Sequence, residues 1–78
     1  MKDVKVLGPG CKRCEATEQM VRVEAAKLGV EVNVEKVTDY AQIVGFGVLS
    51  TPGIVIDGKV VHAGGLPKTE DVAKWLAA

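Results

Sequence analysis

The residues best suited to chemistry in this 78-residue chain are its only two cysteines, Cys11 and Cys14, which lie three positions apart. On the first turn of a helix, side chains at this spacing lie on one side. Their Cα separation can then suit a disulfide, which favours about 5.5–6 Å. The free N–H groups and partial positive charge of a helix start also favour the thiolate, the form of cysteine that attacks. The pair is therefore suited to thiol–disulfide exchange.

Two other roles for this cysteine pair remain open. A structural disulfide that closes a loop of four residues contributes only about 2 kcal/mol in the chain-entropy estimate, against about 3 kcal/mol for a fifteen-residue loop. The pair can also form half of a site for a soft metal ion such as Cu(I) or zinc, which prefers thiolate ligands. Redox exchange is the favoured interpretation of the three.

Local patterns predict the elements that position the cysteines. Val4–Leu7 reads as a strand, Gly8-Pro9-Gly10 ends it, and a helix is expected from about Lys12 to Leu28, where the chain has no glycine or proline. The side of this helix that should face a sheet carries Cys14, Thr17, Val21, Ala25 and Leu28.

The second half of the chain predicts two more helices and three more strands. Alternating Val30, Val32 and Val34, followed by Val37, indicate a second strand. Asp39 is expected to cap a short helix. The remaining segments are a helix at Tyr40–Val44, hairpin arms Ile54–Ile56 and Lys59–His62 around the turn Asp57-Gly58, and a last helix at Glu70–Leu76.

The predicted order is strand, helix, strand, helix, strand, strand, helix. The first two strands should be parallel through a right-handed crossover, and the hairpin should add an antiparallel pair. We therefore expect an α/β fold in which a mixed four-stranded sheet carries three helices on its two faces. Residues 1–78 should form one domain.

Composition narrows the class of protein. Ten basic and ten acidic residues cancel and interleave, so no basic face for nucleic acid is expected. Hydrophobic residues make up 47% of the chain, without a run long enough to span a membrane or a secretion signal. Two closely spaced cysteines do not form an extracellular disulfide framework. These observations predict a cytoplasmic domain, and we expect a monomer.

The Gly-Pro-Gly-Cys-Lys-Arg-Cys loop and the Thr51-Pro52 pair before the hairpin make the chain resemble a minimal thioredoxin fold. More narrowly, it resembles the small thioredoxin-like or glutaredoxin-like redox disulfide proteins of bacteria and archaea. The resemblance covers essentially the whole chain and is especially clear over residues 46–61. It implies a dithiol–disulfide oxidoreductase active in electron transport, in which Cys11 attacks, Cys14 resolves and Pro52 is cis beside the disulfide.

The resemblance also implies the surroundings and partners of the site. The backbone of Thr51 would pair with an extended substrate beside Pro52. Gly10, Lys12 and Arg13 are the candidates for tuning the attacking thiol because of their position next to it in the sequence. Substrates would be protein or small-molecule disulfides, and a separate reductase or thiol would recycle the protein. No bound cofactor and no metal are expected.

Several positions depart from the patterns of related families. Lys-Arg replaces the Gly-Pro of ordinary thioredoxins, and the carboxylate beneath their disulfide has no evident match, since the first strand offers only Asp3 at its start. The Pro-aromatic pair of glutaredoxins is also missing. Small copper chaperones, the alternative class, usually carry Met two positions before the first cysteine, where this chain has Pro9. His62 is expected at the edge of the core rather than as a ligand or base.

Overall fold

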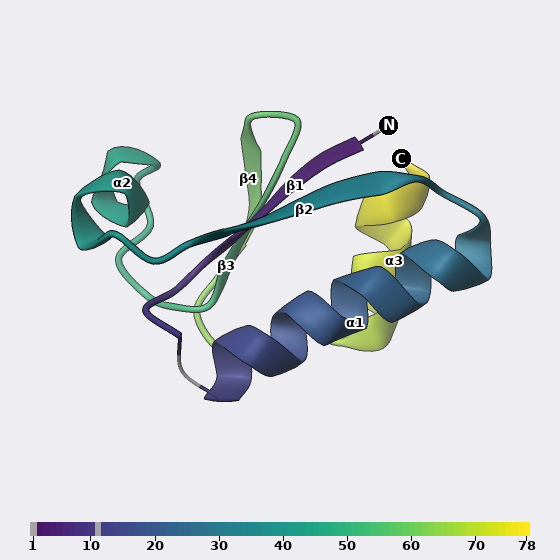
Figure 1. Cartoon of the computed structure of the whole chain (residues 1–78), viewed down its shortest axis with the longest axis horizontal. Coiled ribbons are helices and arrows are strands. Elements are labelled where there is room, and N and C mark those ends of the chain that lie inside the picture. The colour runs from purple at the N-terminus through teal and green to yellow at the C-terminus, as the bar shows by residue number, and fades with distance from the viewer. Residues whose placement is uncertain (1, 11) are drawn as a thin grey trace.

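The computed structural model describes residues 2–10 and 12–78, and these contain a four-stranded mixed sheet with three helices (Figure 1). The predicted order of elements and the predicted α/β fold are both confirmed. The elements are β1 (Lys2–Leu7), α1 (Lys12–Leu28), β2 (Val32–Val37), α2 (Tyr40–Gly45), β3 (Gly53–Ile56), β4 (Lys59–Ala63) and α3 (Thr69–Ala77).

The strands lie in the order β2-β1-β3-β4. β1 and β2 are parallel, with Lys2 opposite Val32 and Leu7 opposite Val37, as a helical crossover between them requires. β1 pairs antiparallel with β3, and β3 with β4. Asp57 and Gly58 join β3 to β4 with φ angles of 50° and 83°, the positive values that a tight hairpin turn needs.

Each face of the sheet has its own apolar cluster, because successive side chains of a strand point to opposite faces. On the face covered by α1 and α3 the buried cluster comprises Val4, Val21, Ala25, Ile54, Ile56, Val72 and Leu76. On the face covered by α2 it comprises Leu7, Val37, Ile43, Val48 and Val55. Figure 1 shows α2 at one end of the sheet, away from both chain termini.

Helix α1 packs on the sheet along most, but not all, of the predicted stripe. Its buried residues are Cys14, Thr17, Val21 and Ala25. The expectation that Leu28 is buried is wrong, since it is 44% exposed. Leu28 is in phase with the stripe, so its exposure follows from its position as the last residue of the helix. The chain then turns at Gly29, whose φ is +68°, and Val30 N–H donates to the Ala25 carbonyl.

Helix α2 is short and is held at both ends. As predicted, Asp39 caps it, since its side chain accepts a hydrogen bond from the Ala41 amide at 3.1 Å. Ile43 is its buried residue. Because α2 has only six residues, it covers only the end of the sheet face near Leu7 and Val37.

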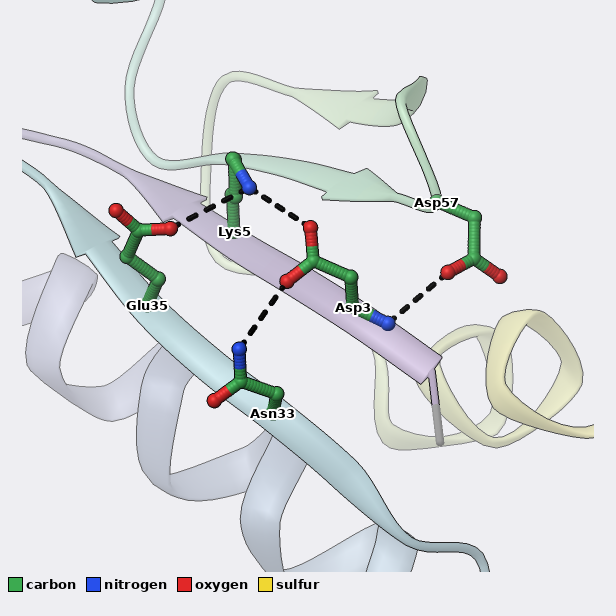
Figure 2. A network of polar contacts seen from close by, with 5 residues as sticks. All are labelled: Asp3, Lys5, Asn33, Glu35 and Asp57. Carbon is green, nitrogen blue, oxygen red and sulfur yellow. Dashed lines mark hydrogen bonds and ion pairs between the residues drawn. The ribbon is translucent and has the colours of Figure 1, made fainter.

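The rest of that sheet face carries a polar network (Figure 2). The Lys5 ammonium lies 2.8 Å from an Asp3 carboxylate oxygen and 3.3 Å from one of Glu35. Asn33 donates to Asp3 at 3.4 Å, and the Asp3 amide donates to the Asp57 side chain at 2.9 Å. These charged and polar groups satisfy one another while they remain in contact with water, so this part of the face needs no covering helix.

The chain ends meet at the far end of the sheet from α2. The Lys2 ammonium donates to the Ala78 carbonyl at 2.6 Å, and Figure 1 shows the start of β1 near the end of α3. Among the described residues, no helix is both long enough and apolar enough to cross a membrane.

The polar network predicts an acid-sensitive contribution to stability. The hydrogen bond from Lys5 lowers the pKa of Asp3, so the stabilisation is present above the carboxyl's unfolded-state pKa and is lost as pH falls through its folded-state value. Below about pH 4, the free energy of unfolding of the native sequence should therefore decline more steeply than that of Asp3→Asn. Urea unfolding across pH 2–7 measures this difference, and parallel curves would contradict the prediction.

The apolar cluster under α2 predicts a large loss of stability when the buried side chain of α2, Ile43, is shortened. Ile43 is 2% exposed, so Ile43→Ala should lower the free energy of unfolding by about 2–4 kcal/mol in urea titration. Val44 is the matched control, since it is 55% exposed on the same helix and Val44→Ala should change stability by no more than about 0.5 kcal/mol. Similar losses from both substitutions would show that α2 does not depend on the cluster.

Candidate functional site

The structure describes one of the two predicted site cysteines, Cys14. The other, Cys11, lies outside the described residues. Cys14 stands in the first turn of α1 and is 5% exposed. Its sulfur is not a free thiol. The Thr17 hydroxyl donates to the Arg13 carbonyl at 2.7 Å, which ties the first turn of the helix to the second. The helix therefore presents a buried sulfur at its start.

Gly8 brings Cys14 and Thr51 together. A Cβ built on Gly8 would overlap the Cys14 sulfur, would lie 3.1 Å from the Cys14 Cβ and would lie 3.8 Å from the Thr51 Cβ. The Gly8 amide donates to the Val37 carbonyl at 2.8 Å, which fixes this backbone to the end of β2. Glycine is thus required here by close approach rather than by backbone conformation.

The segment before β3 forms the other side of this contact. The Thr51–Pro52 peptide bond is cis, Thr51 is half-buried and Pro52 is buried. The Pro52 carbonyl accepts a hydrogen bond from the Gly64 amide at 3.0 Å. Gly64 also approaches Ser50 closely, since a Cβ on Gly64 would lie 3.0 Å from the Ser50 Cβ. The segments around Gly8 and Thr51 therefore meet beside Cys14, and the loop at Gly64 contacts the second of these segments.

The remaining predicted site residues lie at the surface. Lys12 and Arg13 are exposed at the start of α1, and Gly10 is exposed with a φ of +91°. Two exposed apolar side chains flank the loops near Pro52: Leu49 is 87% exposed and Leu66 is 52% exposed. Two exposed cationic side chains thus begin α1, whereas the exposed apolar side chains near Pro52 are leucines.

Sequence reasoning missed a lysine near the sulfur. Lys36 lines a small hollow of about 20 Å³ together with Cys14, Gly8 and Glu15. Its ammonium lies 3.2 Å from a Glu18 carboxylate oxygen. Hydrogen bonds from Arg22 and then from Lys36 lower the pKa of Glu18. No local signal identifies Lys36, because its place depends on β2 lying beside β1.

Two hollows in the described part of the chain are both too small for a large cofactor. The one beside Cys14 has room for about one water molecule. A second, of about 250 Å³, lies by α2 and is lined by Lys5, Glu35, Val37, Gln42, Gly45 and Phe46. It is smaller than the roughly 300–1,000 Å³ of typical ligand pockets. Over residues 2–10 and 12–78, no three His, Cys, Asp or Glu side chains gather in a metal-binding arrangement.

Comparison with known proteins gives one family. The sequence model of the thioredoxin domain family matches residues 2–77. A thioredoxin of Methanothermobacter thermautotrophicus is 29% identical over 77 residues, covering 99% of this chain and 100% of that protein. A thioredoxin of Methanocaldococcus jannaschii is 32% identical over 73 residues, covering 94% of this chain and 84% of that protein.

The contact at Gly8 predicts a strong effect of one added methyl group. Gly8→Ala should lower the free energy of unfolding by about 1–3 kcal/mol, because the new Cβ overlaps the Cys14 sulfur and the structure must shift. Gly45 is the matched control: a Cβ there meets nothing within 4 Å, and its φ is not positive. Gly45→Ala should be neutral or slightly stabilising. Equal urea midpoints for the two variants would refute the close contact.

Proposed function

Because this chain belongs to the thioredoxin domain family, we propose that it is a dithiol–disulfide oxidoreductase whose redox-active pair is Cys11 and Cys14. Family membership supports a thioredoxin-like redox role in general terms. The finer assignment draws its main support from the buried position of Cys14 at the start of α1, against Gly8 and next to Thr51.

The proposed reaction moves two electrons from the dithiol to a substrate disulfide. The Cys11 thiolate attacks one substrate sulfur, which forms a mixed disulfide and releases the other substrate sulfur as a thiolate. Cys14, after losing its proton, attacks the Cys11 sulfur. The substrate leaves with both sulfurs reduced, and Cys11 and Cys14 remain as a disulfide. An external reductase or thiol returns the two electrons.

The burial of Cys14 supports the division of roles. A cysteine residue that is only 5% exposed is poorly placed to attack a disulfide on another protein, but it is well placed to attack a neighbouring mixed disulfide. Exposed Lys12 and Arg13, together with the positive end of α1, favour the thiolate of the attacking cysteine. Nucleophilicity falls as a thiol becomes more acidic, with a Brønsted slope of about 0.4–0.5, so this tuning gives only a several-fold gain.

Positioning of the substrate is assigned to the segment before β3. The backbone of Thr51 would pair with an extended substrate segment, as in β-strand addition, beside buried Pro52. Gly10 would leave the approach to Cys11 open. We propose protein or small-molecule disulfides as substrates, a separate thiol or reductase as electron donor, and a single cytoplasmic domain over residues 1–78 that acts as a monomer.

Single-cysteine variants test the proposed roles. Cys14→Ser should accumulate a mixed disulfide with a protein or small-thiol substrate, because the second step is blocked. Cys11→Ser should trap little, because the remaining sulfur is buried. Non-reducing electrophoresis and intact mass measure the trapped species, and the double variant Cys11→Ser/Cys14→Ser gives the background.

The same experiment distinguishes the metal-carrier alternative. Two thiolate ligands of a soft metal contribute similarly, so either single substitution should weaken binding of Cu(I) or zinc to a similar extent. Equal trapping by both variants, or stoichiometric metal in a reduced protein that does not reduce insulin, would overturn the oxidoreductase proposal in favour of the carrier.

A further inference from the structure

The loop between β4 and α3 lies beside the Thr51–Pro52 segment and has little intrinsic rigidity. Gly64 and Gly65 follow one another with φ angles of +85° and +72°, and neither has a side chain that packs against the core. Such glycines lose much conformational freedom when they are fixed. Contacts from outside the loop must therefore hold it in place.

Two hydrogen bonds hold the described loop residues, one to each glycine. The Gly64 amide donates to the Pro52 carbonyl at 3.0 Å, which joins the loop to the segment proposed to pair with substrate. The Nε2 atom of His62 lies 2.9 Å from the Gly65 carbonyl oxygen. Because a carbonyl can only accept, Nε2 carries the hydrogen and the imidazole donates it. His62 is thus the side chain that fixes the loop on its β4 side.

The imidazole of His62 is itself held by α3. Its ring centroid lies 5.6 Å from that of Trp75, with the planes tilted by 37°. Trp75 packs against the buried cluster beneath α1 and α3. A continuous set of contacts therefore runs from this core through Trp75 and His62 to the Gly65 carbonyl. The hydrogen bond from the adjacent Gly64 amide then connects the loop to Pro52.

We propose that His62 is a positioning residue for protein-disulfide substrates: it holds the Gly64–Leu66 loop against the Thr51–Pro52 segment, so that the two loops present one fixed edge to an extended substrate chain. This inference builds on the proposed function and adds a residue to the same site. His62 would act through the loop, by fixing where the Gly65 carbonyl lies. Exposed Leu66, directly after the fixed glycines, is placed by the same contact to meet an apolar substrate residue.

The role predicts a specific kinetic pattern. His62→Leu keeps an apolar group against Trp75 but removes the donor. KM for a protein disulfide such as that of insulin should rise roughly threefold to tenfold, the change expected for one net hydrogen bond, with little change in kcat. Reduction of a small aromatic disulfide should be unchanged, because that substrate meets the thiols without the loop edge. His62→Gln should restore KM to within about twofold, since its side-chain amide places a donor at the same bond count from Cα.

The experiment compares the full chain and these variants with excess dithiothreitol as reductant. Amide hydrogen exchange of Gly64, measured by NMR, gives a readout that does not depend on activity. Exchange should become faster in His62→Leu and return in His62→Gln, while amides in α1 keep their rates. Val60→Ala is the matched control on β4, because Val60 pairs with Val55, whose side chain belongs to the opposite face. It should change neither readout.

Each outcome has a defined meaning. Faster Gly64 exchange together with a raised protein-disulfide KM, both restored by Gln, supports the proposal. Unchanged exchange in His62→Leu overturns the anchoring role, and faster exchange with unchanged KM overturns the positioning role. An equal loss of activity toward the small disulfide would also overturn it. Failure of the proposed function is seen separately, as absence of disulfide reduction by the native sequence before any variant is compared.

Discussion

The contact between the Gly8 backbone and the Cys14 sulfur is the constraint on which the site depends. Gly8 is bonded through its amide to the end of β2, so its position is set by the sheet rather than by the loop that follows. The start of α1 packs directly on this backbone, and Thr51 also lies close to it. A larger residue at position 8 would separate the helix, the strand end and the proline loop, whatever the rest of the core contributed.

The two faces of the sheet differ in how they are covered. The face under α1 and α3 carries a continuous apolar cluster, which fixes the helix that bears the sulfur. The opposite face has only the short helix α2, placed near the end of the sheet where the site lies. On the remainder of that face, the ion pairs of Lys5 with Asp3 and Glu35 occupy the surface, and no helix of the described residues covers it. In this small domain, helices therefore cover both faces of the sheet near the site, while one face is exposed to water elsewhere.

Local patterns predicted the order of the elements, the Asp39 cap and the Asp57-Gly58 turn, because each is decided by neighbours in the sequence. The rules for connections between strands then predicted the mixed four-stranded sheet, and the resemblance identified the family. The features missed depend on residues that meet only after folding. Asp3 and Asp57 are 54 positions apart, and no periodicity indicates that they bond. The overlap at Gly8 and the hydrogen bond from His62 to Gly65 are contacts of the same kind, set by tertiary approach. Leu28 shows the converse, since a correct helical phase does not ensure burial at a helix end.

Because Lys2 lies next to Ala78, both ends of the domain offer attachment points for fusion partners, surfaces or labels. β1 runs from Lys2 to the strand end next to Gly8, so about 20 Å of extended chain separates the paired ends from the sulfur. A fused domain, a surface tether or a fluorophore at either end would point away from the loops around Cys14. A short peptide bridging the two ends would likewise produce tandem or circularly rearranged versions in which those loops stay unobstructed.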